Sequence, residues 1–330
     1  MIEIINKNFS LQEIAVSGQC FRMRELPAEC AADRAALAEE PAGAVADQKA
    51  PAAEKAADGI TDQAALAEES ADGAFKSRFE ILAGEKRLIA GQCGDRISFD
   101  CGREEFDSFW RAYFDLETDY GQIIDSIDPA DEYLVCAAES CPGMRILRQD
   151  PWEMLVTFLI SQQNNIPRIR KCVENICAKY GRDMGAHFAF PQPEALACLG
   201  EDDLMPCNLG YRSKYVVRAA RAVIAGRGTG RLEAECFDLD ALGGLGYDEA
   251  MSALLRLFGV GVKVANCICL FGLHHVDAFP VDTHIKQIFD AHYRDGFPFE
   301  RYRGYAGILQ QYMFYYDLHG ERQQVCEAQA

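Results

Sequence analysis

Residues 257–288, LFGVGVKVANCICLFGLHHVDAFPVDTHIKQI, constrain the fold more than any other stretch of the chain. Within them, Phe258-Gly259-Val260-Gly261 separates two apolar runs, which predicts a tight hairpin between two short helices. Both glycines permit a positive φ and let the backbone approach another molecule closely. The free backbone N–H groups at the start of the second helix favour an anion. We therefore expect Gly259, Val260 and Gly261 to bind a phosphate.

Two ionisable residues follow this hairpin. Lys263 lies in the otherwise apolar sequence Val262–Ala265, which predicts an amine held partly out of water. Partial burial favours the neutral amine, and the neutral amine is the nucleophile. Asp282 follows 19 residues later in Pro-Val-Asp-Thr-His, which has the form of a helix start with Asp282 as N-cap. Taken alone, a lysine and an aspartate at this spacing are weak evidence for shared chemistry.

These residues together resemble the helix-hairpin-helix DNA glycosylases, whose catalytic aspartate follows a Gly/Pro-rich loop. Within that superfamily the stretch is most similar to the 8-oxoguanine DNA glycosylases. Phe258 replaces the proline that is usual in their hairpin, and it leaves both glycines in place. The resemblance implies that Lys263 attacks C1′ of the sugar and forms a Schiff base, while Asp282 stabilises the cationic sugar. We also place His284 among the residues expected to contact DNA phosphate.

The N-terminal part carries a second motif of this family, Ser-Gly-Gln-Cys-Phe-Arg at residues 17–22. By itself, a glycine between short strand-like runs indicates a turn. In the 8-oxoguanine glycosylases the carbonyl of this glycine accepts a hydrogen bond from N7–H of the oxidised base. Guanine has no proton on N7, so a single backbone acceptor can distinguish the lesion from the normal base. The resemblance therefore assigns lesion discrimination to Gly18.

A polar loop, Ser161–Asn165, interrupts two helical patterns, and its spacing alone indicates a solvated connection. In the family, this loop and a later Tyr-Arg pair attend the cytosine left behind by the flipped base. The corresponding residues here are Gln163, Arg168, Tyr211 and Arg212. Gln163 replaces the family's asparagine but keeps an amide. The tyrosine is expected to wedge into the base stack, and the two guanidinium groups suit the O2 and N3 acceptors of cytosine.

The pattern of residues 305–318 predicts a C-terminal helix, closely similar to the last helix of the family. Gln310 and Phe314 are four residues apart and therefore share one face of it. Without the resemblance, this is an ordinary amphipathic helix. The resemblance implies that Gln310 hydrogen-bonds the Watson–Crick edge of the extruded base and that Phe314 stacks on it. Cys267, one turn after Lys263, is expected to form the opposite wall of this base pocket.

The rest of the chain predicts an α+β protein. Short strand patterns separated by turns predict an N-terminal antiparallel-sheet domain over residues 1–120, and helical patterns predict an all-α helix-hairpin-helix domain over residues 121–330. Residues 26–74 are rich in Ala, Glu and Asp and contain a repeated octet, so we expect a disordered acidic insertion there.

Composition limits the partners and the compartment. Residues 25–74 contain 12 acidic and 3 basic residues, a net charge of −9, which is half of the −18 of the whole chain. The total charge therefore does not exclude binding to DNA. The chain has no run of 18 apolar residues, so we expect no membrane-spanning segment. MIEIINKNFS lacks the basic stretch followed by an apolar stretch that is typical of a secretion signal. The 14 cysteines of a chain this long favour reduced, intracellular thiols. We expect an intracellular monomer, cytoplasmic or nucleoid-associated if bacterial, with no membrane partner.

No cofactor is expected. Only Cys326 follows Cys269, so the four closely spaced C-terminal cysteines of the iron–sulfur relatives are missing. No His, Cys and carboxylate cluster has metal-ligand spacing either. The expected function is a bifunctional DNA glycosylase and lyase that acts on duplex DNA containing 8-oxoguanine opposite cytosine. Two alternatives remain. The first is a monofunctional glycosylase for alkylated bases; proteins of that class lack the lysine found here at position 263, which argues against it. The second is a non-catalytic helix-hairpin-helix protein that only binds DNA.

Overall fold

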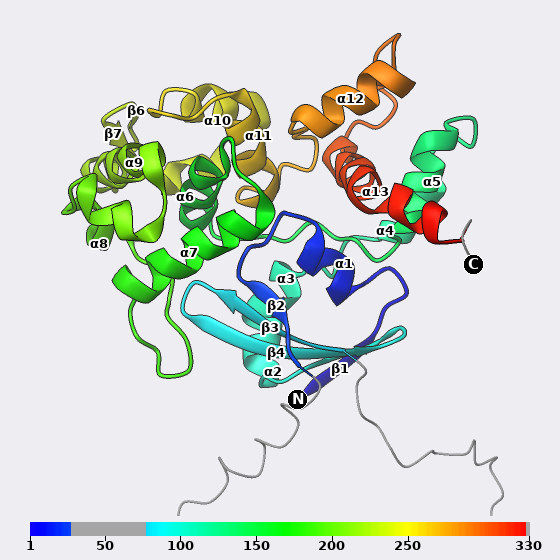
Figure 1. Ribbon diagram of the computed structural model, residues 1–330, viewed down its shortest axis with the longest axis horizontal. Coiled ribbons are helices and arrows are strands. Elements are labelled where there is room, and N and C mark those ends of the chain that lie inside the picture. The colour runs from blue at the N-terminus through cyan, green and yellow to red at the C-terminus, as the bar shows by residue number, and fades with distance from the viewer. Residues whose placement is uncertain (28–76, 328–330) are drawn as a thin grey trace, which may run out of the picture.

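The computed structural model describes residues 1–27 and 77–327, with side chains described as far as residue 320. An antiparallel sheet forms one layer, and helices cover its inner face and continue into a larger helical region (Figure 1). The predicted α+β fold is therefore confirmed. The expected acidic insertion falls almost entirely on residues 28–76, which lie outside the described part. Among the described residues, no helix combines the length and apolar character needed to cross a bilayer.

The sheet has five antiparallel strands in the order β1-β5-β4-β3-β2. Their bounds are β1 Ile2–Ile5, β2 Met23–Glu25, β3 Ser77–Ala83, β4 Lys86–Cys93 and β5 Arg96–Phe99. Three of them were predicted from alternating apolar residues, and the alternation places one set of side chains inward. Ile81, Leu88 and Ile97 are fully buried on this inner face. Because each is on a different neighbouring strand, they form one continuous apolar surface for the covering helices.

Short helices cover this face of the sheet: α1 Leu11–Val16, α2 Arg103–Glu105, the π-helical turn Phe106–Trp110 and α3 Arg111–Tyr113. Aromatic side chains dominate the core between the two layers. Phe99 lies 5.1 Å from Phe106 and 5.5 Å from Phe114 between ring centroids, and Trp110 is fully buried beside them. The predicted helical stretch at residues 104–114 is thus confirmed, although it includes a π turn that the apolar spacing does not reveal.

The remaining helices form a second core. Their bounds are α4 Tyr120–Asp125, α5 Glu132–Ser140, α6 Pro151–Ser161, α7 Ile166–Tyr180, α8 Pro193–Ala197, α9 Ser213–Gly226, α10 Tyr247–Leu254, α11 Val262–Phe271, α12 Thr283–His292 and α13 Ala306–Glu327, with 3-10 turns at Asp202–Cys207, Gly210–Arg212 and Asp240–Gly244. A small antiparallel hairpin of β6 Leu232–Glu233 and β7 Cys236–Phe237 lies between α9 and α10.

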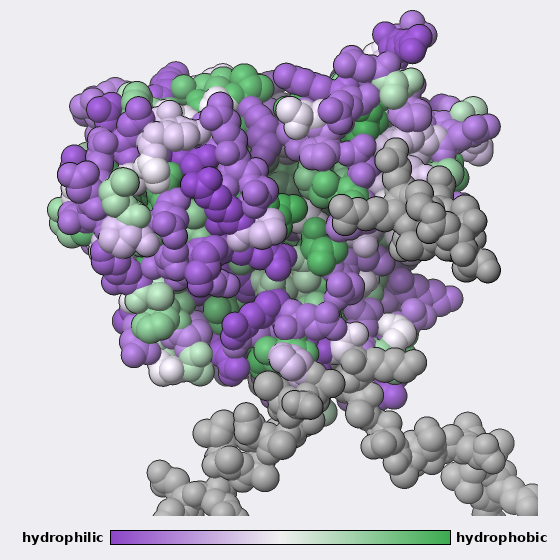
Figure 2. All heavy atoms as spheres, in the orientation of Figure 1, coloured by the Kyte–Doolittle hydropathy of each residue, from purple (hydrophilic) through white to green (hydrophobic). Residues whose placement is uncertain are grey.

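Two groups of helices face each other across a hollow. Helices α6 to α11 form one group, and α12, α13 and α5 form the other, with α1 and the sheet beneath both (Figure 1). Figure 2, in the same orientation, shows hydrophobic side chains gathered in this hollow and a mainly hydrophilic surface around it. The N-terminal end of α11 and the N-terminal end of α12, which carry the predicted Lys and Asp, both belong to this region of the molecule.

Candidate active site

The hairpin between α10 and α11 has one glycine that its geometry requires. Gly259 has a φ of +90°, and a Cβ there would lie 2.6 Å from Cδ1 of Tyr215, so only glycine fits. Gly261 does not use this freedom, because its φ of −97° is accessible to any residue. It is instead the N-cap of α11, and no side chain caps that end. The free amides of this first turn, with the positive end of the helix dipole, are suited to a phosphate.

Lys263 and Cys267 lie one turn apart on α11 and face the same space. The Lys263 side chain is half-buried, with its Nζ 5.4 Å from the centroid of the Phe158 ring on α6. Cys267 is 2% exposed, and this burial raises the pKa of its thiol, although the nearby Lys263 acts in the opposite direction. The thiol therefore remains neutral at physiological pH and provides an apolar wall with a weak hydrogen-bonding group.

Asp282 is the N-cap of α12, as predicted. Its Oδ1 accepts a hydrogen bond of 3.0 Å from the backbone N–H of Ile285. The other carboxylate oxygen is left for other partners, because a carboxylate accepts several hydrogen bonds. Asp282 and Lys263 both line one small pocket, and both act on the buried thiol of Cys267. Residues 19 positions apart in the chain are therefore brought to the same point in space.

We call this space the hairpin pocket. Residues from four distant parts of the chain line it: Ser17, Gly18, Phe158, Lys263, Cys267, Phe271, Pro280, Asp282, Gln310, Gln311 and Phe314. The two predicted catalytic residues and all four residues predicted to hold a flipped base are among them. The pocket thus combines an amine, a carboxylate, an aromatic ring and an amide around one small space.

Gly18 lies at the edge of the hairpin pocket in a constrained loop. Its φ is +78°, and a Cβ there would lie 3.3 Å from Cδ1 of Ile166 and 3.4 Å from Cε1 of Phe314. The next residue fixes the loop, because Gln19 is fully buried and its amide bonds the backbone on both sides. Its Nε2 donates to the carbonyl of Arg145 at 2.9 Å, and its Oε1 accepts from the N–H of Leu147 at 2.8 Å.

The amide of Gln310 is held in a defined orientation. Gln310 is 2% exposed, and its Nε2 donates to the carbonyl of Pro280 at 3.2 Å. Its Oε1 accepts from Nε2 of Gln311 at 2.9 Å. Pro280 lies two residues before Asp282, so this hydrogen bond ties α13 to the start of α12. A fixed amide can present one donor and one acceptor to a planar ligand with little loss of entropy.

Comparison with known proteins agrees with this geometry. Residues 1–155 match the N-terminal domain of 8-oxoguanine DNA glycosylase, and residues 156–296 match the HhH-GPD superfamily of base excision DNA repair proteins. The two parts of the chain belong, respectively, to the family of 8-oxoguanine DNA glycosylase N-terminal domains and to the HhH-GPD superfamily. These two matches together extend from the first strand to the turn after α12, so they include both parts of the fold.

Individual members of the family are moderately similar. An N-glycosylase/DNA lyase from Saccharomyces cerevisiae is 32% identical over 198 residues, 57% of this chain and 52% of that protein. A relative of the same description from Arabidopsis thaliana is 39% identical over 155 residues, 44% of this chain and 40% of its own. The matched part thus spans about half the length of these curated relatives. A solved structure is also similar, that of the 8-oxoguanine glycosylase/lyase of Clostridium acetobutylicum in complex with DNA that contains cytosine opposite 8-oxoguanine. It superposes on this chain with a TM-score of 0.74 and is 28% identical in sequence. The superposition covers 96% of this chain and 93% of the other.

The loop that the family uses beside the opposite base is held from within. Arg212 is 3% exposed, and its guanidinium donates to the carbonyls of Gln162, at 2.7 Å from Nε, and of Gln163, at 2.8 Å from Nη2. Gln163 has a φ of +48°, a strained conformation for a non-glycine residue, so these bonds help to maintain it. Gln162 Nε2 also donates to the carbonyl of Gly259 at 3.0 Å and connects this loop to the hairpin.

The other residues predicted for this role are exposed. Tyr211 is 45% exposed, and its hydroxyl lies 3.3 Å from Oε1 of Gln163. Arg168 is exposed on the first turn of α7. Arg212 differs, because four of its hydrogen bonds go to backbone carbonyls of the chain itself. In this structure Arg212 holds the loop, while Arg168 and Tyr211 are presented to solvent.

His284 is linked to α13 rather than left free at the helix start. Its Nδ1 lies 2.6 Å from Oδ2 of Asp317, and its ring meets Phe314 edge to face at 5.6 Å. This link places His284 against the side of Phe314 in the hairpin pocket. Nε2 is the ring nitrogen left over for a phosphate. Within the described residues, no group of three or more His, Cys, Asp or Glu is placed to hold a metal ion.

Sequence reasoning did not find every residue of the hairpin pocket. Phe158 and Phe271 are buried in apolar helices and give no local signal that one face of each ring meets a pocket. Gln311 could have been found, because a second amide beside Gln310 in an apolar helix is unusual for a core position. Asp317 and Gln162 were missed because their partners, His284 and Gly259, lie far away in the chain.

Proposed function

We propose that this chain excises 8-oxoguanine opposite cytosine from duplex DNA and then cleaves the abasic strand. One observation carries the proposal: the amine of Lys263 and the carboxylate of Asp282 line the same pocket as the four residues predicted to hold the base, Gly18, Cys267, Gln310 and Phe314. That pocket lies beside a hairpin suited to phosphate. The family's activity supports this reading, and duplex DNA containing the lesion is the proposed partner of a monomeric enzyme.

Recognition of the lesion requires the base to leave the helix. Tyr211 is exposed beside the loop and can replace the lost stacking with its own ring. Arg168, and Arg212 if it exchanges its backbone partners, would read the cytosine left behind. In the hairpin pocket, Phe314 and Cys267 would hold the flipped base between them, and Gln310 would bond its Watson–Crick edge. The Gly18 carbonyl would then accept the N7–H that only the oxidised base carries.

Chemistry at C1′ follows from the two ionisable groups. As the bond from C1′ to the base breaks, the sugar becomes cationic, and the carboxylate of Asp282 stabilises it. The neutral amine of Lys263 forms a bond to C1′, and its proton passes to the departing base or to water. The C1′–O4′ bond then breaks, O4′ takes up a proton as the sugar ring opens, and the resulting iminium acidifies the proton on C2′. Removal of that proton expels the 3′ phosphate and breaks the strand.

Borohydride trapping tests this proposal directly. Duplexes with one 8-oxoguanine opposite C, A, G or T are incubated with the enzyme and borohydride, which reduces the imine to a stable adduct. We expect an adduct with highest yield opposite cytosine. We also expect Lys263→Gln to lose the adduct and strand cleavage, and to lose base excision by at least about 100-fold, in line with removal of a nucleophile. Near-normal excision by this variant would rule out Lys263 as the nucleophile.

The alkylated-base glycosylase has a specific observation against it. That class lacks a lysine at position 263, whereas here Lys263 lines the hairpin pocket beside Asp282. Excision of 3-methyladenine without any trapped adduct would favour that alternative. A protein that only binds DNA would show neither reaction, and would leave the buried amide of Gln310 and the cap carboxylate of Asp282 without a catalytic use.

A further inference from the structure

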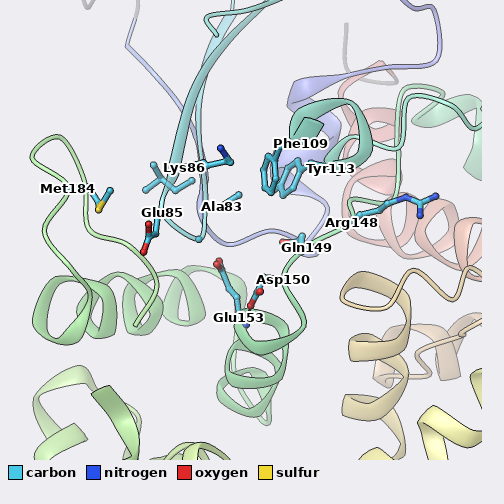
Figure 3. A pocket seen from close by; sticks show the side chains of 12 residues that line it. Ala83, Glu85, Lys86, Phe109, Tyr113, Arg148, Gln149, Asp150, Glu153 and Met184 are labelled. Carbon is cyan, nitrogen blue, oxygen red and sulfur yellow. Dashed lines mark hydrogen bonds between the residues drawn. The ribbon is translucent and has the colours of Figure 1, made fainter. Parts of the chain in front are cut away.

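A second and larger cavity is connected through Gln149 to the loop that carries Gly18. Its volume is about 610 Å³, within the range of about 300–1,000 Å³ that is usual for small-molecule sites. We call it the sheet–helix cavity. The β3–β4 turn, the π turn with α3, and residues 148–153 surround it, and Met184 closes one side (Figure 3). It shares no lining residue with the hairpin pocket.

The charges in the sheet–helix cavity do not balance. Its cations already have acidic partners, since Lys86 lies 3.7 Å from Glu105 and Arg148 lies 2.9 Å from Asp115. The rim residue Glu85 is likewise paired, with Arg182. Two further carboxyl groups lie at the base of the cavity, that of Asp150 and that of Glu153, which is paired with Arg22, and Figure 3 shows both pointing up into the cavity from the start of α6.

These two carboxyl groups retain acceptor capacity. Asp150 Oδ1 accepts the N–H of Glu153 at 2.8 Å as the N-cap of α6, and its side chain is accessible from the cavity. Glu153 is 6% exposed, and its one cation, Nη1 of Arg22, is 3.5 Å from Oε2. Burial and the proximity of Asp150 raise the pKa of Glu153 to about 7, against the effect of Arg22. The backbone N–H groups of Trp152 and Gly84 also interact with Asp150 and Glu153, respectively, and because a carboxylate has about four acceptor positions, both groups can still accept from a ligand.

An aromatic wall faces the carboxyl groups across the cavity. The rings of Phe109 and Tyr113 are stacked with centroids 5.8 Å apart, and both line the space. Lys86 Nζ covers the Phe109 ring at 5.2 Å, but its side chain is 41% exposed and can move away. A planar ligand could thus lie along an aromatic ring while its edge meets the carboxyl groups.

We infer that the sheet–helix cavity binds a planar base of the guanine type, with its N1–H and 2-amino groups donating to Asp150 and Glu153. Such a base offers two neighbouring donors on one edge and a flat ring for Phe109. Adenine offers an acceptor at N1 and fits this acidic edge poorly. The base released in the proposed reaction has the same donor edge, so this choice of ligand rests on the proposed function.

The position of the cavity gives such binding a structural consequence. Gln149 lines the cavity, and its Nε2 donates to the carbonyl of Gln19 at 2.9 Å. Gln19 follows Gly18 directly and anchors that loop. A ligand in the sheet–helix cavity would therefore contact the same support that holds Gly18 at the hairpin pocket. Gln149 and Gln19 thus connect the lining of one site to the loop beside the other.

Nucleoside titration of the full chain, labelled with ¹³C at its methionine methyl groups, tests the inference. Met184 lines the sheet–helix cavity and no residue of the hairpin pocket is a methionine, so its resonance, assigned with Met184→Leu, reports on this site alone. We expect guanosine to shift it saturably. Inosine, which lacks only the 2-amino group, and adenosine should bind at least ten-fold more weakly.

Three variants complete the test. Asp150→Asn removes a charge but keeps an N-cap residue of equal quality, and should weaken guanosine at least ten-fold. Phe109→Leu changes only the aromatic wall of the cavity and should weaken guanosine binding several-fold. This variant provides the test if Asp150→Asn does not fold. Gln310→Ala should leave the titration unchanged. No saturable shift, an unchanged affinity in both cavity variants, or loss in Gln310→Ala would overturn the inference. None of these measurements requires excision, so a failure of the proposed function would be seen separately, by trapping.

Discussion

Two features of the structure favour glycine at position 18. Its backbone is left-handed, and two side chains approach it closely. Its φ of +78° costs an L-residue about 1–2 kcal/mol. A side chain there would also press on Ile166 and Phe314 at 3.3 and 3.4 Å. Because Phe314 lines the hairpin pocket, the second effect would reach the proposed base site, whereas the first would affect only stability.

Gly18→Ala separates these effects when it is compared with Gly94→Ala. Gly94 also has a positive φ, +57°, but no atom lies within 4 Å of a Cβ placed there. We expect both variants to lose about 1 kcal/mol of unfolding free energy. Only Gly18→Ala should also lose excision of 8-oxoguanine, by about ten-fold or more. Thermal unfolding and single-turnover excision measure the two quantities. Equal excision by both variants would remove Gly18 from the base site.

Gln310 allows a second test at this scale. Its amide is buried and fixed by Pro280 and Gln311. Gln310→Ala should weaken binding to lesion-containing duplex by about ten-fold or more, because a desolvated amide makes hydrogen bonds worth about 1–2 kcal/mol. Binding to undamaged duplex should change little. Fluorescence anisotropy with both duplexes measures the difference, and equal losses on the two would place Gln310 outside the base pocket.

At the scale of elements, the start of α12 combines a structural and a chemical task in one residue. Asp282 caps the helix through its Oδ1 and also presents its carboxylate to the hairpin pocket. The loop between α6 and α7 is also positioned by distant residues. Arg212 donates hydrogen bonds to its backbone, and Gln162 of the loop donates to the carbonyl of Gly259 in the hairpin. Each of these elements is shaped locally by its cap and is placed by a contact from far along the chain.

The two tasks of Asp282 can be separated with two substitutions. Asparagine caps a helix as well as aspartate does, whereas alanine removes the cap at a cost of about 1 kcal/mol. Asp282→Asn should therefore keep wild-type stability and lose excision, while Asp282→Ala should lose both. Chemical denaturation and excision assays decide this. Full excision by Asp282→Asn would show that its charge is not used at C1′.

At the scale of the whole molecule, the core is divided in two. One cluster lies under the sheet, and the other runs through the helices from Tyr120 to Met313. This division supports our proposal that the first domain ends near residue 120. Two residues cross it, since Phe21 packs with the helical cluster and Leu147 with the sheet cluster. The buried pair of Arg22 and Glu153 also joins the two regions.

Glu153 makes stability depend on pH. Its pKa is raised from 4.5 to about 7, chiefly by burial. The folded state therefore holds a proton that the unfolded chain has lost, and this contribution is complete below pH 4.5 and disappears as pH rises through 7. Burial raises the pKa of Glu13 to about 7 as well, with the same sign. His275, whose pKa is lowered by burial, acts weakly in the opposite direction.

We therefore expect the Tm to fall by several degrees between pH 5 and pH 8. Glu153→Gln should reduce this slope, because the amide does not titrate. Glu139→Gln, which changes an exposed glutamate of α5, is the matched control and should leave the slope unchanged. Thermal scans at fixed ionic strength measure the slopes. A wild-type Tm that rises over this range would contradict the proposed protonation of Glu153.

Local sequence determined the elements and much of the chemistry. Asp282 caps the helix that it was predicted to cap, since a cap depends on residues only three positions away. The strands at residues 77–99 and the glycine-bounded hairpin follow from equally local preferences. Resemblance added the roles of Gly18 and Gln310, whose neighbours in the chain do not reveal them. The φ of −97° at Gly261 shows that a glycine permits a positive φ without requiring it.

Tertiary structure alone decided which of these groups meet. Lys263, Asp282, Gly18 and Gln310 come from parts of the chain that no periodicity connects, and packing of α11, α12 and α13 against the N-terminal loop brings them to one pocket. It also turned Arg212 inward, because the carbonyls of Gln162 and Gln163 needed donors, and it enclosed Glu153 between sheet and helices. The reason is physical: burial and hydrogen-bond satisfaction depend on every surface that folds onto a residue, whereas capping and turn geometry depend on a few neighbours.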